Sequence, residues 1–279
     1  MSDEQLARTY TMQASEAEHA RLVAVARRDS DHVREMCARA SVGEGARVVD
    51  VGCGPIGALL ELARIVGPQG TVVGVDGSAE AIETARGIVA QNGHGNVHLV
   101  HGDVNAMEAA AIANDGPFDA AYLRFMLIHQ GDPAATLRRV AALLRPGGQV
   151  LVHDYVEDAR FPRYDPPVPA SERAFDLHTA TRHRRGAAAD VGRRLPRLCE
   201  EAGLQVLDAR GAFSVQWQAR DMLEDIRRLL LSSRRDTVGF GLATDAEVDA
   251  LVEELGAATG QEFRSALGFL FVQVIAQVP

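Results

Sequence analysis

From residue 46 onward, short apolar runs alternate with segments of helical periodicity. Strands that are buried on both faces of a sheet are continuously apolar, and the pairs Val48-Val49 and Val72-Val73 have this character. The alternation is typical of parallel strands joined by crossover helices. We therefore predict strands at 47–51, 71–75, 97–100, 118–123 and 149–153. The helices predicted between them span residues 56–66, 79–92 and 133–144.

The segments on either side of this alternation predict helical additions. Residues 1–40 have apolar positions at helical spacing and predict an N-terminal helical lid, which precedes a core at residues 41–158. Residues 159–190 are interpreted as an Arg-rich lid insert, and the prolines between residues 162 and 169 argue against a long helix at its start. Residues 191–279 complete the core and carry a helical insert. The elements expected there are helices at 193–202, 222–231 and 245–255 and strands at 205–209 and 267–276.

Composition narrows the classes of function. A formal net charge of -9 argues against a nucleic-acid partner, because phosphate binding depends on Lys and Arg. The chain has no long apolar run and no signal-peptide pattern at its start, so we expect no membrane partner and a cytoplasmic location. Cys37, Cys53 and Cys199 lack metal-binding spacing, which is consistent with a reducing compartment and with the absence of a metal site.

The strongest chemical signal is the glycine-rich turn after the first predicted strand. Gly52, Gly54 and Gly57 match the pattern G-x-G-x-x-G, in which glycines let a ligand approach the backbone. This pattern alone fits NAD as well as an adenosyl cofactor. Asp50 would place a carboxylate near the pyrophosphate of a dinucleotide, whereas a cofactor with an ammonium and a sulfonium group would be attracted to it. Asp50 could instead cap the nearby turn.

Acidic residues also follow the next two predicted strands. Asp76 comes nineteen residues after Gly57, where a carboxylate can accept hydrogen bonds from ribose hydroxyls. Asp103 follows the third strand and could accept a hydrogen bond from an adenine amino group. Each has a structural alternative: Asp76 as a helix N-cap, a task that Ser78 could perform, and Asp103 as a loop acid. Because ligands bind at the carboxyl ends of parallel strands, we expect these acids to converge on one crevice.

The segment 49–55, Val-Asp-Val-Gly-Cys-Gly-Pro, resembles the first motif of class I S-adenosylmethionine-dependent methyltransferases. Segments 74–76, 102–104, 118–124 and 144–151 resemble later motifs of the family in the same order. The segment around Tyr10 is similar to that of bacterial natural-product methyltransferases. The resemblance implies a Rossmann-like α/β fold, with a seven-stranded, mostly parallel sheet whose last strand is antiparallel, and S-adenosylmethionine as cofactor.

The resemblance also assigns roles to the acids. Asp50 would serve the methionine end of the cofactor, Asp76 the ribose and Asp103 the adenine. Arg124, at the end of the fourth strand, is interpreted as lining the cofactor pocket. The predicted cofactor-binding residues are Asp50, Gly52, Gly54, Asp76, Gly77, Asp103, Val104 and Arg124.

Methyl transfer from a sulfonium needs mainly alignment and exclusion of water, and a base only where the acceptor must lose a proton. The candidate catalytic residues are His129, Asp154, Tyr155 and Tyr10, and each has an alternative as a packing or loop residue. Strand alternation sends Asp154 to one side and His153 and Tyr155 to the other. The arginine excess at 160–197 favours an anionic small-molecule acceptor or forms a solvated face. Exchange of the N-terminal lid between subunits would give a homo-oligomer.

The sequence thus predicts an enzyme that methylates an oxygen, nitrogen or carbon atom of a small molecule, in natural-product biosynthesis. Three other readings remain open at this point. An NAD(P)-dependent oxidoreductase would need a second mononucleotide-binding half, which the sequence does not show. A cyclase would bind S-adenosylmethionine on the same fold without transferring the methyl group. A non-catalytic binding protein would have no need of three converging carboxylates.

Overall fold

The computed structural model describes residues 30–113, 116–156, 164–188, 190–212, 215–216, 220–259, 265–267 and 270–279. Its main sheet has seven strands in the order β3-β2-β1-β4-β5-β10-β7. The first five strands in this order run parallel, whereas β10 is antiparallel to both β5 and β7. The predicted α/β sheet with an antiparallel last strand is confirmed. The strands are β1 (Arg47–Val51), β2 (Thr71–Asp76), β3 (Val97–His101), β4 (Phe118–Arg124), β5 (Leu144–Tyr155), β7 (Gln205–Ala212) and β10 (Phe271–Gln277).

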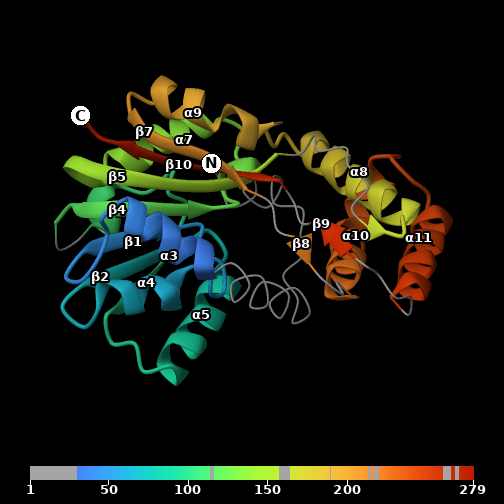
Figure 1. The fold of residues 1–279 in the computed structure, drawn as a ribbon, viewed down its shortest axis with the longest axis horizontal. Helices are drawn as coiled ribbons and strands as arrows, with labels where there is room; N and C mark the ends of the chain where they lie inside the picture. Colours follow the sequence, from blue (N-terminus) through green and yellow to red (C-terminus); the bar gives the residue numbers. More distant parts are fainter. Residues whose placement is uncertain are drawn as a thin grey trace.

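Helices cover both faces of this sheet (Figure 1). One face packs against α3 (Ser30–Arg39), α4 (Leu59–Val66) and α5 (Ala79–Gln91), and the other against α7 (Pro133–Ala141) and α9 (Val191–Glu201). Each layer has its own apolar core, because alternate side chains of the central strands point to opposite faces. The short helices α6 (Ala109–Ile112) and η1 (Leu127–His129) lie in connections after β3 and β4.

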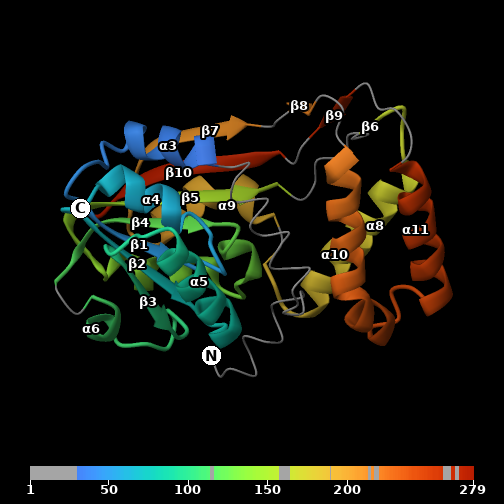
Figure 2. The same ribbon diagram turned by 90° about the horizontal axis from the view of Figure 1, so that it is seen from below.

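A second unit, the helical lobe, stands beyond the carboxyl ends of β4 and β5 (Figures 1 and 2). It consists of α8 (Pro169–Arg184), α10 (Arg220–Gly239) and α11 (Asp245–Ala258), with the strands β6 (Tyr164–Asp165), β8 (Val215–Gln216) and β9 (Ser265–Leu267). The three helices enclose a separate apolar core. Ligands of open α/β sheets bind at the carboxyl ends of the strands, so the lobe stands on the side where a ligand is expected.

The structure corrects several predicted boundaries. As the prolines predicted, no helix occurs before Pro169 in the described part of the insert; the long helix α8 begins at that residue, because proline is accommodated in the first helical turn. The helix predicted at 133–144 ends at Ala141, and β5 already begins at Leu144, where it pairs with Phe118 before a register shift. The sheet β6-β9-β8 was not predicted. Tyr10 and residues 1–29 of the predicted N-terminal lid fall outside the described residues, and α3 is the part of the lid that the structure describes.

No helix in the described ranges is long and apolar enough to cross a membrane. The same ranges contain no group of His, Cys, Asp and Glu side chains arranged to hold a metal ion.

The first turn of α9 packs directly on the backbone that leaves β5. A Cβ at Gly192 would lie 2.5 Å from the carbonyl oxygen of Tyr155 and 2.8 Å from Val156 N. We expect Gly192→Ala to lower the free energy of unfolding by about 1–3 kcal/mol in urea denaturation, because backbone atoms must shift. Gly256→Ala in α11 is the matched control, since nothing lies within 4 Å of its Cβ, and it should be neutral or stabilising by up to about 1 kcal/mol. Equal stability of the Gly192→Ala variant and the wild type would contradict this packing.

Candidate active site

The glycine-rich turn is fastened to the end of β2 by Asp76. Gly54 N donates a hydrogen bond to Asp76 Oδ2 at 2.8 Å, and Ser78 N donates to Asp76 Oδ1 at 2.8 Å. Ser78, rather than Asp76, is the N-cap of α5, because its hydroxyl accepts from Ala81 N. Burial raises the pKa of Asp76, and the hydrogen bonds from Ser78 and Gly54 partly oppose this change. The carboxylate thus joins the two turns that border the predicted ribose site.

Gly54 leaves open space beside the turn. Its φ is +58°, and a Cβ at this position would meet no atom within 4 Å. Gly57 differs, because its Cβ would lie 2.3 Å from Cys53 O, so the turn itself requires a glycine there. An open backbone position next to a carboxylate that can accept hydrogen bonds from hydroxyls fits an adenosyl cofactor.

Asp50 is buried beneath the same turn. Its side chain is 2% exposed, and Oδ2 accepts a hydrogen bond from Ala58 N at 3.1 Å. Burial raises the pKa of Asp50 to about 7, while the Ala58 hydrogen bond and the charge of Arg124 lower it and the charge of Asp76 raises it. Asp50 therefore does cap the turn, as the structural alternative predicted. Its role toward the methionine end of a cofactor remains a prediction, and the two roles are compatible.

Asp103 belongs to a polar network that extends away from β3. Its Oδ1 accepts hydrogen bonds from Asn105 N at 2.9 Å and from Asn105 Nδ2 at 3.1 Å. Asn105 Nδ2 also donates to Gln130 Oε1 at 3.0 Å, and Thr136 Oγ1 donates to Asn105 Oδ1 at 2.9 Å. Val104, between the two polar residues, is buried. Gln130 was missed from the sequence, where nothing distinguishes it from any other polar loop residue.

The segment after β4 brings further candidates to the same edge. Arg124 ends β4, and its guanidinium carbon lies 5.8 Å from the centre of the Phe125 ring. Because β4 lies between β1 and β5 in the sheet, Arg124 is near both strand ends, and its charge lowers the pKa of both Asp50 and His153. His129 lies half-buried at the end of η1. The assignments of Arg124 to the cofactor and of His129 to catalysis stay predictions.

The end of β5 carries three consecutive candidates on two faces. Asp154 is fully buried, and its carboxylate accepts hydrogen bonds from Ile128 N and Tyr155 N, both at 3.0 Å. Burial raises the pKa of Asp154 to about 7, against the lowering effect of these bonds and of the charge of Arg182. Tyr155 faces the other way, with its ring centre 5.0 Å from that of Phe125. The described contacts of Asp154 are thus to the protein backbone, whereas Tyr155 shares the face of the aromatic side chains.

His153 lies within a cluster of rings at this edge. Its ring centre is 4.3 Å from that of Phe271, 4.9 Å from that of Phe125 and 5.6 Å from that of His32. Burial and the charge of Arg124 lower the pKa of His153 well below its usual value. Both effects favour the neutral imidazole, and within the described residues neither ring nitrogen has a hydrogen-bond partner. The strand pattern alone gave no reason to choose His153 over its neighbours.

The cofactor-binding candidates therefore gather at one edge, as the convergence of strand ends predicted. Asp50 lies one residue before the end of β1, Asp76 and Arg124 are the last residues of β2 and β4, and Asp103 follows β3. Gly77 adjoins Asp76, and its carbonyl oxygen lies 3.2 Å from His101 Nε2.

Comparison with known proteins agrees with this geometry. Residues 43–203 match the family model described as a methyltransferase domain. O-methyltransferase resE of Aspergillus sclerotiorum is 28% identical over 228 residues, which are 81% of this chain and 78% of that protein. O-methyltransferase cnsE of Penicillium expansum is 36% identical over 139 residues, which are 48% of this chain and 46% of that protein. Demethylmenaquinone methyltransferase of Geobacillus kaustophilus is 34% identical over 113 residues, which are 40% of this chain and 47% of that protein. The chain spans about half the length of several curated relatives that it matches.

Solved structures show the same fold. A protein of Bacillus halodurans C-125 that is assigned as a methyltransferase superposes with a TM-score of 0.57 at 20% identity, over 88% of this chain and 98% of that one. The [4+2]-cyclase SpnF superposes with a TM-score of 0.56 at 19% identity, over 90% of this chain and 81% of that one. The predicted family, the fold and the choice of S-adenosylmethionine over a dinucleotide are confirmed. The family model covers more than half of the chain, and the chain belongs to the methyltransferase domain family, among the class I S-adenosylmethionine-dependent enzymes.

Proposed function

We propose that this protein transfers the methyl group of S-adenosylmethionine to a hydroxyl oxygen of a small molecule. The observation that carries the proposal is the position of η1. This turn holds His129 between the Asp103 network and the helical lobe, with Gln130 bonded to Asn105 on one side and Ile128 bonded to Arg182 on the other. An imidazole at this place can take up the proton of a hydroxyl acceptor. Two relatives named O-methyltransferases support the choice of oxygen.

The cofactor supplies a methyl group on a sulfonium, so that the leaving group is already activated. Asp76 and Asp103 would bind its ribose hydroxyls and its adenine, and Asp50 its ammonium group. His129 accepts the acceptor's hydroxyl proton as the oxygen becomes nucleophilic. The helical lobe covers the acceptor side. There it would exclude water and hold the acceptor in line with the methyl group.

Further support bears on the kind of acceptor. Ring side chains at the ends of β4 and β5, including Phe125 and Tyr155, favour an acceptor with a planar apolar part. The arginine excess at residues 160–197 favours an anionic group on it. The resemblance around Tyr10 favours a natural product. All three cysteines are free thiols, which supports a cytoplasmic location.

The test is transfer of label from methyl-labelled S-adenosylmethionine to a panel of phenols and hydroxy acids. We expect labelled methyl ethers with the wild type and a 10²- to 10⁴-fold lower kcat with His129→Gln, because the base is lost. S-adenosylhomocysteine affinity should be unchanged by this substitution. His98→Gln is the matched control, since His98 is exposed on the edge strand β3, and it should not affect turnover.

Two outcomes would redirect the proposal. Label that stays on the cofactor while the acceptor cyclises would favour the chemistry of a cyclase, whose fold the chain shares. Label on carbon or nitrogen would retain methyl transfer but exclude the hydroxyl acceptor and the role of His129 in its deprotonation.

A further inference from the structure

A buried guanidinium connects the helical lobe with the core. Arg182 lies in the last turn of α8, is 1% exposed, and donates from Nη1 to Ile128 O at 2.5 Å. Arginine is rarely buried so completely, because its charge must be removed from water. Burial lowers the pKa of Arg182, and the nearby Tyr155 and Asp154 oppose this. At this position the interpretation of the arginine excess as a solvated face is wrong.

The residue that Arg182 binds is held from both sides. Ile128 donates its N–H to Asp154 Oδ2 at 3.0 Å, so the sheet holds its amide while the lobe holds its carbonyl. Two residues along the chain, Gln130 O accepts a hydrogen bond from Ala188 N at 3.0 Å. Residues 128–130 are therefore clamped between β5 and the segment that leaves α8.

The same three residues reach the predicted adenine site. Gln130 Oε1 accepts from Asn105 Nδ2, and Asn105 donates twice to Asp103. A ligand that orders Asp103 would thereby order Asn105, Gln130 and the η1 turn. The η1 turn is in turn bonded to α8 through Arg182.

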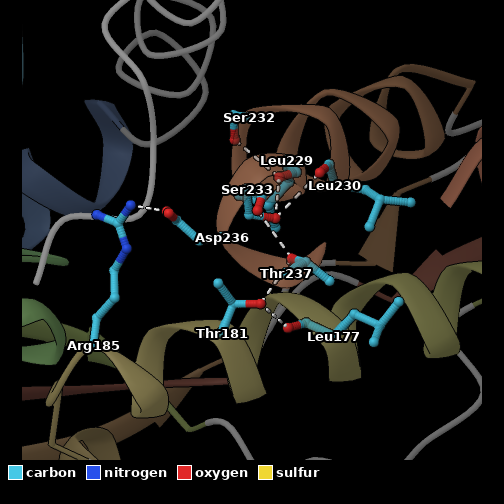
Figure 3. Close-up of polar contacts among 9 residues, drawn as sticks. All are labelled: Leu177, Thr181, Arg185, Leu229, Leu230, Ser232, Ser233, Asp236 and Thr237. Atoms are coloured by element: carbon cyan, nitrogen blue, oxygen red, sulfur yellow. Dashed lines mark hydrogen bonds and ion pairs between the residues drawn. The ribbon is translucent and has the colours of Figure 1, made fainter. Parts of the chain in front are cut away.

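Within the lobe, α8 is fixed to α10 on either side of Arg182 (Figure 3). Thr181 Oγ1 and Thr237 Oγ1 lie 2.8 Å apart, and Thr237 Oγ1 donates to Ser233 O at 2.9 Å. Arg185 forms an ion pair with Asp236. These buried and half-buried contacts join α8 to α10, so we expect a constraint on Arg182 to act on both helices.

We propose that Arg182 is a positioning residue that couples the cofactor site to the helical lobe by holding the carbonyl of Ile128. Filling of the site at Asp103 then stabilises the position of α8, and with it the wall of the acceptor site. The proposal rests on the proposed function in one respect: the ligand that fills this site is an adenosyl cofactor.

The test is amide hydrogen exchange, followed by mass spectrometry, with and without S-adenosylhomocysteine. In the wild type we expect slower exchange both in the core around residues 97–108 and in α8. In Arg182→Met the core should still respond, whereas the response of α8 should be lost. The affinity of Arg182→Met for S-adenosylhomocysteine should fall about fivefold or more, because ordering of the lobe no longer contributes to the free energy of binding. Arg184→Met, an exposed arginine on the same helix, is the matched control and should behave as the wild type.

The conservative variant Arg182→Lys should restore part of the response in α8, because it keeps a donor and a positive charge. Undiminished protection of α8 in folded Arg182→Met would overturn the coupling. If Arg182→Met does not fold, the wild type and Arg182→Lys still test the coupling. If the ligand protects the core of the wild type but not α8, the coupling is overturned while the proposed function stands. A wild type that does not bind S-adenosylhomocysteine at all would overturn the proposed function with it.

Discussion

Asp76→Ala is expected to weaken the binding of S-adenosylhomocysteine roughly 5- to 150-fold, which corresponds to about 1–3 kcal/mol. The carboxylate would accept the ribose hydroxyls, and it also holds Gly54 N and Ser78 N. Its loss therefore removes a ligand contact and loosens the glycine turn together. Isothermal titration measures the affinity, and urea denaturation separates the loss of binding from the loss of stability.

Ser78→Ala is the matched control for Asp76→Ala. It removes the N-cap of α5, which costs about 1 kcal/mol of stability, but leaves the carboxylate of Asp76 in place. We expect its affinity for S-adenosylhomocysteine to stay within about twofold of the wild type. Equal affinity of the Asp76→Ala variant and the wild type would contradict the ribose assignment.

The sheet and the predicted cofactor edge could be inferred from the sequence because their signals are local. Strands that are buried on both faces are apolar without interruption, as at Val48 and Val49, and a glycine turn between a strand and a helix indicates a nucleotide-binding edge, whichever nucleotide it binds. Since the carboxyl ends of parallel strands meet at one edge, the convergence of Asp50, Asp76 and Asp103 followed from topology alone. The antiparallel β10 between β5 and β7 was available only through the resemblance to the family.

The contacts between the core and the lobe could not be inferred in this way. Arg182 meets the carbonyl of Ile128 across 54 positions of sequence, and a carbonyl leaves no trace in a sequence pattern. Strand alternation correctly placed Asp154 and His153 on opposite faces of the sheet. It could not predict that the carboxylate of Asp154 accepts hydrogen bonds from two backbone N–H groups. The very short strands β6, β8 and β9 show no periodicity that two or three residues could reveal.

Asp50→Asn is expected to stabilise the cofactor-free protein at alkaline pH. The folded wild type holds Asp50 with a pKa of about 7, above the ordinary value of 3.8, because of burial. Between about pH 4 and pH 7 the folded state binds more protons than the unfolded state, so the free energy of unfolding falls as the pH rises and levels off above about 7. A pKa change from 3.8 to about 7 corresponds to an upper limit of roughly 4 kcal/mol at pH 8. Asparagine carries no such cost.

Urea denaturation without cofactor at pH 4.5, 6 and 8 measures the difference between the two proteins. Asp154 has a similarly raised pKa but is present in both, so the difference reports on Asp50. Binding should change in the opposite sense, with S-adenosylmethionine held roughly 10- to 150-fold more weakly by the variant at pH 8, because a charged contact is lost. A stability difference that does not change with pH would contradict the buried charge. If the difference does change but affinity is unaltered, Asp50 serves only to cap the turn, and the cationic end of the cofactor is bound elsewhere.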